Sequence, residues 1–286
     1  MGGVVFGAIL VHDEVIHVMG TNKIESQRIC GSKYLQSSME GVYKQIENEL
    51  SSNKKVLFTG CPCQCAAVEA MFKTRKNYNN LYLCEILCHG VPSPGIFKDW
   101  ISYLENKYGD VVSDYRFRSK KNGWSRPTVE IYFENGKRIV QSHNESNYHM
   151  WFGRHLSLRP SCYKCKYRNI KRVADITLGD FWGIKALEIS DEETEKGTSV
   201  LLVNTEKGME LLNKARMLNK IFLEKISIEN AYVNNSPSLH NFARPKERED
   251  FFDVYKNESI KGIIKKYPSE NKAISILRKV KHILTR

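Results

Sequence analysis

The chain opens with apolar positions in the pattern of β-strands. Residues 3–11 and 14–19 predict two short strands, joined as a hairpin by a turn at residues 12–14. The pattern then changes to helical spacing, and residues 38–50 predict an amphipathic helix. Its apolar face is formed by Met39, Val42, Tyr43, Ile46 and Leu50.

The clearest unit lies between residues 55 and 108. Residues 55–59 and 81–87 predict two buried strands, and residues 64–72 predict a helix between them. A second helix is expected from Pro94 to about residue 108, with Ser93 as its N-cap and Gly109 as its stop. Strands and helices that alternate at this spacing indicate parallel strands with crossover helices.

From residue 111 the chain alternates as half-exposed strands do. Residues 111–118 and 129–133 predict two strands, and Asn135-Gly136 predicts a hairpin turn before residues 138–141. Residues 174–178 and 199–203 predict further strands, and Thr205 is expected to cap a helix that reaches about residue 218. The predicted fold class is α+β (mixed α/β), with βαβ crossovers in the first half, an extra β-hairpin and a helical carboxy-terminal extension.

Composition sets limits on this picture. The 286 residues are 41% hydrophobic and 27% charged, which excludes wholesale disorder. We expect a body at residues 1–252, with a βαβ part at about 1–110 and a carboxy-terminal part at 111–252, followed by a basic helical tail at 253–286. The longest apolar run, residues 2–11, is about half as long as a membrane span, and no basic region precedes it. We therefore expect a cytoplasmic protein without a transmembrane segment, and the early apolar strand suggests that a segment once lay upstream.

The formal net charge of +12 is concentrated late in the chain, at residues 246–248 and 261–286. Apolar residues follow helical spacing there: Ile260, Ile263, Ile264, Ile274, Ile276, Leu277, Val280 and Leu284. This pattern favours a solvated basic helix, and the alternative is a surface for an acidic protein or an anionic membrane. We expect no nucleic-acid partner, because no zinc-finger, RNP or helix-turn-helix signature is present.

Eight cysteines carry the candidate chemistry: Cys30, Cys61, Cys63, Cys65, Cys84, Cys88, Cys162 and Cys165. In a cytosolic chain, clustered cysteines more often bind metal than form disulfides. Cys63 and Cys88 follow two successive parallel strands, so they are expected to meet at one edge of the sheet. Cys63 also lies at the start of a predicted helix, which would favour its thiolate. Cys162 and Cys165 would complete four ligands, and spacing alone leaves zinc and a four-iron cluster open, with a redox dithiol less favoured.

The motifs at these positions resemble those of the coenzyme F420 hydrogenase/dehydrogenase beta subunit family. The matching segments are FTGCPCQ (58–64), CHGVPSP (88–94), CYKC (162–165) and ADITLGDFWG (174–183), supported by SKYLQS (32–37) and VNTEKG (203–208). The resemblance extends from about residue 2 to about residue 252. It implies an oxidoreductase that binds FAD beside a [4Fe-4S] cluster and passes electrons to a deazaflavin or another two-electron acceptor.

The resemblance also implies roles for individual residues. The cluster ligands would be Cys63, Cys88, Cys162 and Cys165. Cys61 and Cys65 are additional to the family pattern and are interpreted as small buried side chains, with ligand exchange or an accessory redox role as the alternative. Cys30 and Cys84 are expected to pack in the core.

Residues that would contact the flavin are polar groups for its pyrophosphate and flat surfaces for its ring. They are Ser32, Lys33, Tyr34, Gln36, Ser37, Thr59, Gly60, Gln64 and Trp182. His89 would hydrogen-bond a cluster sulfide or relay a proton, and Asp180 would orient the flavin or hold a turn. Without the family, residues 32–37 read as a polar loop, His89 as a structural histidine and residues 181–182 as a core plug. No G-x-G-x-x-G motif is present, so a Rossmann-type site is not expected.

Longer relatives carry a ferredoxin-like segment with further clustered cysteines, and none precedes residue 2 here. We therefore expect electrons from a ferredoxin or ferredoxin-like subunit, unless the chain is a truncated product. A basic collar formed by Lys164, Lys166, Arg168, Lys171 and Arg172 would suit an acidic donor. Two other interpretations remain open: a structural zinc protein, and a degenerate accessory protein in surface-polysaccharide biosynthesis.

Overall fold

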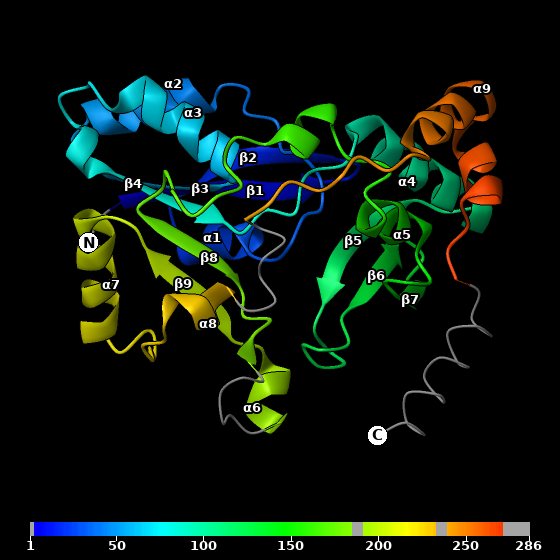
Figure 1. Ribbon diagram of the computed structural model, residues 1–286. Coiled ribbons are helices and arrows are strands. Elements are labelled where there is room, and N and C mark those ends of the chain that lie inside the picture. The colour runs from blue at the N-terminus through cyan, green and yellow to red at the C-terminus, as the bar shows by residue number, and fades with distance from the viewer. Residues whose placement is uncertain (1–2, 185–190, 233–238, 271–286) are drawn as a thin grey trace.

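The computed structural model describes residues 3–184, 191–232 and 239–270, which form two sheets and the helices packed on them (Figure 1). The strands are β1 Gly3–Val11, β2 Glu14–Gly20, β3 Lys55–Gly60, β4 Leu81–Ile86, β5 Val112–Ser119, β6 Thr128–Phe133, β7 Arg138–Ser142, β8 Ile176–Asp180 and β9 Ser199–Val203. The helices are α1 Lys23–Ile29, α2 Val42–Ser51, α3 Pro62–Phe72, α4 Pro94–Tyr108, α5 Asn147–Gly153, α6 Asp191–Lys196, α7 Glu206–Met217, α8 Ile228–Tyr232 and α9 Arg248–Lys266.

The first sheet has the strand order β2-β1-β3-β4-β8-β9. Its four central strands are parallel, and the edge strands β2 and β9 are antiparallel to their neighbours. The predicted hairpin is confirmed, and so is the βαβ unit in which α3 connects β3 to β4. The pairing of Gly60 with Glu85 shows that β3 and β4 end side by side, which brings together the loops that follow them.

Helices cover both faces of this sheet. On one face, α2 and α3 bury Ile46, Val68 and Phe72 against Phe6 and Phe58. On the other face, α1 contacts β1 and β2, and α7 contacts β9 (Figure 1). The sheet is therefore a covered layer, and the carboxyl ends of its parallel strands are the place where connecting loops can form a site.

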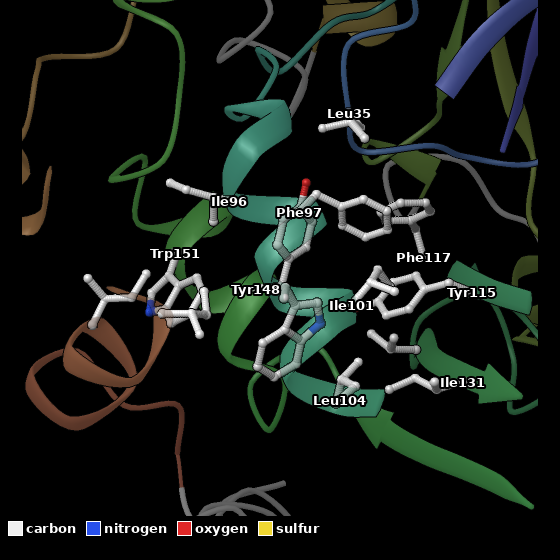
Figure 2. Packing of buried hydrophobic residues seen from close by; sticks show 14 of the residues in the cluster. Leu35, Ile96, Phe97, Ile101, Leu104, Tyr115, Phe117, Ile131, Tyr148 and Trp151 are labelled. Atoms are coloured by element: carbon white, nitrogen blue, oxygen red, sulfur yellow. The ribbon is translucent and has the colours of Figure 1, made fainter. Parts of the chain in front are cut away.

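The second sheet is an antiparallel meander in the order β5-β6-β7. It packs with α4, α5 and α9 around the largest core, in which Phe97, Tyr115, Phe117, Tyr148 and Trp151 are central (Figure 2). Phe97 contacts Tyr115 and Tyr148 edge-on, and the indole of Trp151 donates a hydrogen bond to the Tyr267 carbonyl at 2.7 Å. The α+β fold class is confirmed.

The carboxy-terminal segment differs from its prediction as a solvated extension. Within α9, Phe251, Val254, Ile260 and Ile263 are buried in the largest core, so residues 253–266 belong to the body. The expected boundary at residue 252 falls inside this helix. The remaining predicted tail positions, Ile274, Ile276, Leu277, Val280 and Leu284, lie outside the described residues.

Helices α1 and α5 were not predicted from the sequence. The first begins at Asn22, whose side chain accepts a hydrogen bond from the Glu25 backbone N–H. The second buries Tyr148, His149, Trp151 and Phe152, so it has no polar stripe that would reveal helical periodicity. No helix among the described residues is long and apolar enough to cross a membrane.

Candidate functional site

Three loops meet at the carboxyl edge of the parallel strands. One follows β3 and enters α3 through Cys63, and the second follows β4 through Cys88. The third loop carries Cys162 and Cys165. It is joined to the second loop by hydrogen bonds from Arg159 N to Val91 O at 3.0 Å and from Ser93 N to Ser157 O at 2.9 Å. Gly90 has a φ of +110°, and a Cβ there would lie 3.1 Å from Leu158 and 3.5 Å from the Cβ of Cys162. The close approach of these two loops therefore depends on glycine.

The structure brings Cys63, Cys88, Cys162 and Cys165 together. Burial, followed by the charges of the other three thiols, raises the pKa of Cys63 to about 11. The pKa of Cys162 is raised by burial, with smaller contributions from Cys88 and Cys165. The helix terminus that was expected to favour the Cys63 thiolate is outweighed by burial and by the neighbouring thiols, which raise the pKa of this group. The thiols of Cys63 and Cys162 are therefore protonated near pH 7 unless a cation binds beside them.

Cys88 differs from Cys63 and Cys162 in its environment. The Cys61 thiol is hydrogen-bonded to it, the Gly90 N–H donates to its sulfur at 3.3 Å, and Arg168 lies nearby. These contacts lower the pKa of Cys88 to about 7, the Cys61 hydrogen bond being the largest cause, whereas the pKa of Cys61 is raised. Cys61 therefore contacts the candidate ligand Cys88 and does more than fill space in the core.

A buried guanidinium faces the same group of cysteines. Arg168 is 8% exposed and donates to the Cys88 carbonyl at 3.4 Å, and its guanidinium lies 3.9 Å from the Phe242 ring centroid. Its Nε and Nη1 atoms are buried and have no hydrogen-bond partner in the described part of the chain. Unpartnered N–H groups beside several thiols suit an anionic group bound between them, since a buried charge without a partner is costly.

The described residues contain no ready-made site for a single metal ion. Among residues 3–184, 191–232 and 239–270, no three His, Cys, Asp or Glu side chains are arranged to hold a single metal ion. A structural zinc site needs four ligands around one ion, whereas each thiolate of a four-iron cluster binds its own iron.

The other cysteines divide into two kinds. Cys65 and Cys84 are buried, and the Cys65 thiol donates to the Cys84 carbonyl at 3.7 Å, so the prediction of core packing is confirmed for both. For Cys30 that prediction is wrong, because this residue is exposed at the end of α1. Its thiol donates to the Ser26 carbonyl at 3.6 Å, a local contact within the helix terminus.

Several residues predicted to contact a flavin are hydrogen-bonded within the protein. Lys33 Nζ donates to the carbonyls of Ile29 at 2.7 Å and Cys30 at 2.8 Å, and burial lowers its pKa to about 8. Thr59 Oγ1 donates to the Phe6 carbonyl at 2.9 Å. These side chains hold α1 and the first sheet in place.

The remaining polar candidates connect the predicted loop to its neighbours. Gln64 accepts a hydrogen bond from Cys61 N at 3.0 Å and donates to Ser37 Oγ at 2.9 Å, close beside Gly60. Gln36 accepts a hydrogen bond from Arg159 in the Cys162 loop. Ser32 is exposed and is hydrogen-bonded to the Tyr34 hydroxyl. Residues 32–37 thus form one wall beside the loops that carry Cys63 and Cys162.

A second group of side chains joins the two sheets. Asp180, at the end of β8, accepts a hydrogen bond from Trp124 Nε1 at 3.0 Å and pairs with Arg118 Nη2 of β5 at 3.3 Å. The Trp182 side chain is 43% exposed, and its ring lies 4.7 Å from Trp124 and 5.3 Å from the Arg118 guanidinium. Phe181 is buried, so of the two aromatic residues only Phe181 is a core plug.

Arg118 connects this group to the wall formed by residues 32–37. Its side chain is 4% exposed and is hydrogen-bonded to the Tyr34 hydroxyl, and Tyr34 stacks on Phe152 at 5.0 Å. The Arg118 Nε atom is buried and has no hydrogen-bond partner among the described residues. Arg118 and Trp124 were not predicted from the sequence, since only the packing of one sheet on the other brings them to Asp180.

The predicted site residue His89 faces a second histidine and two phenylalanine rings. Its Nε2 lies 2.9 Å from Nε2 of His155, and its ring packs on Phe152 and Phe242. Burial lowers the pKa of His89 to about 4, so the ring is neutral near pH 7.

The predicted basic collar is smaller than the sequence suggested. Lys164, Lys166 and Lys171 are exposed. Arg168 turns inward toward the cysteines, and Arg172 is 2% exposed and pairs with the buried Glu85 at 3.5 Å. Three lysines therefore remain as the outer surface of this loop, and the two arginines belong to its interior.

The fold and this site define a cysteine-rich α+β protein whose candidate centre lies at the carboxyl edge of a mixed sheet. The chain belongs to the coenzyme F420 hydrogenase/dehydrogenase family, and the family model for the C terminus of the beta subunit matches residues 53–229. The resemblance seen in the motifs is thereby confirmed, and the family is one of oxidoreductases.

A solved structure shows the same fold. A chain of the F420-reducing [NiFe] hydrogenase complex from Methanosarcina barkeri, in a xenon-derivatized form, superposes with a TM-score of 0.52 at 16% sequence identity. The match covers 89% of this chain and 80% of that chain. At this identity the likeness concerns the fold alone. No curated protein matches the sequence.

Proposed function

We propose that the protein is a flavin- and iron–sulfur-dependent oxidoreductase that passes electrons between a [4Fe-4S] cluster and FAD, and on to a two-electron acceptor. The family supports the class of reaction. The observation that supports a cluster is that four cysteines from three loops lie near the buried Arg168. The Nε and Nη1 atoms of Arg168 have no hydrogen-bond partner in the part of the chain that the structure describes.

Each residue near the proposed cluster has a role that follows from its contacts. Cys63, Cys88, Cys162 and Cys165 would hold the iron through thiolate. The Gly90 N–H and the Cys61 thiol would donate hydrogen bonds to the Cys88 sulfur, which affects the reduction potential of such clusters. The Arg168 guanidinium would offset the negative charge of the four thiolates.

The proposed flavin position is the junction between residues 32–37 and the group at Asp180. The exposed ring of Trp182 offers a flat surface, and the buried guanidinium of Arg118 offers donors for an anionic or carbonyl oxygen. A flavin supplies the conversion between one-electron and two-electron transfer, which a cluster alone cannot perform. Ser37, Thr59 and Gln64 would act by holding the loops, since their polar groups are already hydrogen-bonded.

Cofactor analysis of anaerobically purified protein tests the proposal. We expect a brown protein with broad absorption at roughly 400 nm, iron and acid-labile sulfide near four each per chain, and FAD released on denaturation. A colourless protein with stoichiometric zinc and no sulfide after anaerobic reconstitution would establish the structural zinc alternative, because Zn²⁺ is d¹⁰. The same preparation without any flavin would remove the two-electron step.

We further propose an acidic ferredoxin, or a ferredoxin-like subunit, as the electron donor. The exposed Lys164, Lys166 and Lys171 lie on the loop that carries Cys162 and Cys165, so a donor bound there would be close to the proposed cluster. Reduced ferredoxin mixed with the holoprotein should reduce the flavin at a rate that falls with ionic strength. Charge reversal at these three lysines should slow the reaction, and the same change at Lys44 on α2 is the control. Equal rates for all variants would refute this docking site.

A further inference from the structure

The end of α7 and the turn that follows it expose five apolar side chains. Met217, Leu218 and Phe222 are 83%, 62% and 92% exposed, and Ile221 and Leu223 are 38% exposed. We call residues 217–223 the apolar tip. Single exposed apolar side chains are ordinary on protein surfaces, but five within seven residues are a concentration that marks a binding surface.

Backbone geometry makes the tip project from the end of the helix. Asn219 has a φ of +52°, and Lys220 N donates to the Ala215 carbonyl at 3.1 Å, so the helix is closed by a left-handed turn. Residues 221–227 that follow have no regular secondary structure. The apolar side chains therefore stand at a convex end of α7, and their exposure shows that no described part of the body covers them.

The charges around the tip are mostly positive. Arg216, Lys220 and Lys225 are exposed, and Lys214 is partly exposed, with its ammonium 4.0 Å from Glu210. Glu224 is the acidic residue among positions 214–225. A partner that satisfies this surface must accept apolar side chains and carry negative charge around them, which is the chemistry of a bilayer with anionic headgroups.

An apolar groove continues from the same helix. It has a volume of about 210 Å³ and lies between Leu211 and Lys214 of α7 and the sheet residues Val5, Leu57 and Tyr82. Leu211, Lys214 and Leu218 follow each other at three- and four-residue spacing, so they share one face of the helix. The groove thus lies on the same face of α7 as Leu218, and α7 lies on the side of the sheet opposite α2 (Figure 1).

We propose that the apolar tip inserts into the interfacial layer of an anionic membrane, with Arg216, Lys220 and Lys225 at the headgroups. Nearly complete exposure of Met217 and Phe222 suits a fluid medium, which adapts to a convex tip without a matching pocket. The attachment is peripheral, because it uses one turn of helix and the turn that follows it. This inference is independent of the proposed cofactors and adds a site of action at a membrane surface.

Vesicle co-sedimentation of the purified full chain tests the proposal. Binding to vesicles of phosphatidylcholine with phosphatidylglycerol should be at least roughly tenfold tighter than to phosphatidylcholine alone. The double variant Met217→Ser/Phe222→Ser should weaken binding to the anionic vesicles by at least roughly tenfold, because burial of even one such apolar side chain strengthens binding by about tenfold. Lys220→Glu/Lys225→Glu should weaken it as well.

Matched controls separate the tip from general basic charge. Ile24→Ser on α1 removes an apolar side chain that is 75% exposed elsewhere, and Lys44→Glu reverses a charge on α2. Both should bind vesicles as the unmodified protein does, and iron and flavin content should be the same in all variants. Unchanged binding of the Met217/Phe222 variant would overturn the proposal. So would absence of vesicle binding, including the case where sedimentation velocity shows that the tip joins two chains or a protein partner.

Discussion

At the residue scale, the chemistry of the site depends on arginines whose charged groups face the interior of the protein. Arg118, Arg168 and Arg172 all have buried side chains, and each has at least one nitrogen without a hydrogen-bond partner among the described residues. Buried guanidinium groups of this kind normally have anionic partners. Their presence beside Asp180 and the cysteine loops separates this region from an ordinary loop-covered sheet edge.

The cysteines give the sharpest prediction at this scale. Changing Cys63, Cys88, Cys162 or Cys165 to Ser should each abolish a stable cluster, since a hard alkoxide replaces thiolate poorly as an iron ligand. Iron and sulfide per chain, together with the absorption at roughly 400 nm, are the measurements. The expected result is loss of most of the iron in each of the four variants.

Matched changes at the other cysteines provide the controls. Cys30→Ser and Cys84→Ala should retain iron, because these residues lie outside the group of four. Cys61→Ser and Cys65→Ala should also retain most of it, although Cys61 contacts Cys88 and its variant is the more sensitive control. A series in which Cys61 is required and Cys63 is dispensable would overturn the ligand assignment.

The sequence predicted this site in part. Cys63 and Cys88 could be paired because neighbouring parallel strands end at the same edge, and this rule needs only the order of strands and helices. Arg118 and Trp124 could not be found, since they belong to the second sheet and reach Asp180 only through packing between sheets. The inward direction of Arg168 and Arg172 was also beyond prediction, because the surrounding loop has no periodicity from which burial can be inferred.

At the scale of elements, the helical spacing of α9 was predicted correctly, but the prediction that solvent surrounds this helix was wrong. The apolar positions at Ile260 and Ile263 were recognised, but the many lysines suggested solvent on all sides. The helix instead packs against α4, and its apolar side chains enter the largest core while Lys261, Lys265 and Lys266 stay outside or partly outside. A tail that supplies core residues is part of the folding unit.

A strained residue interrupts α9 and allows a test. Ser259 has φ +61° and ψ −163°, a region of backbone conformation that is essentially restricted to glycine. Its side chain is exposed, so replacement loses little packing. We expect Ser259→Gly to raise the free energy of unfolding by about 1 kcal/mol, measured by denaturant titration.

The control for this variant is Ser102→Gly in α4. Ser102 is exposed and lies inside a regular helix, so glycine there should lower the free energy of unfolding by roughly 0.5–1 kcal/mol. Opposite signs for the two variants would locate the strain at Ser259. A decrease for both would show that the backbone at Ser259 is not strained in solution.

The motif at residues 203–208 has a structural role that motif matching did not reveal. Thr205 Oγ1 donates to the carboxylate of Asp175 at 2.6 Å, and Lys207 Nζ lies 3.5 Å from the same carboxylate. A Cβ at Gly208 would lie 2.2 Å from the Asp175 carbonyl oxygen, so glycine is required for the helix to approach. This motif fastens α7 to the amino end of β8, away from the cysteine loops.

At the scale of the whole molecule, buried histidines couple folding to pH. Burial is the main cause that lowers the pKa values of His17, His143 and His149, and His149 is shifted furthest. The ring nitrogens of His149 are held by Phe117 O at 2.9 Å and Ser146 Oγ at 3.1 Å. These rings stay neutral in the folded protein at pH values where the unfolded chain takes up protons.

The sign of the pH dependence follows from this difference. Below an unfolded pKa of about 6.5, the unfolded chain binds more protons than the folded one, so stability falls as pH falls. His12 acts in the opposite direction, because its hydrogen bond to Glu105 at 2.9 Å is the main cause that raises its pKa. His12 therefore adds stability at acid pH, which is lost as pH rises through its folded pKa. The pKa values of His89 and His155 are lowered as well, so five histidines with lowered pKa values outweigh His12, which is largely exposed.

We therefore expect the free energy of unfolding to fall between pH 7 and pH 5.5 by about 1 kcal/mol for each fully buried histidine, measured by urea titration at each pH. The variant His149→Asn should show a smaller fall over this range, because a titrating group has been removed from the unfolded state. If that variant does not fold, His143→Gln provides the same comparison at the neighbouring ring. His12→Gln should show a larger fall, since it removes the histidine whose pKa is raised in the folded protein. Parallel pH curves for all these variants would contradict the assignment and place the acid sensitivity in carboxylates instead.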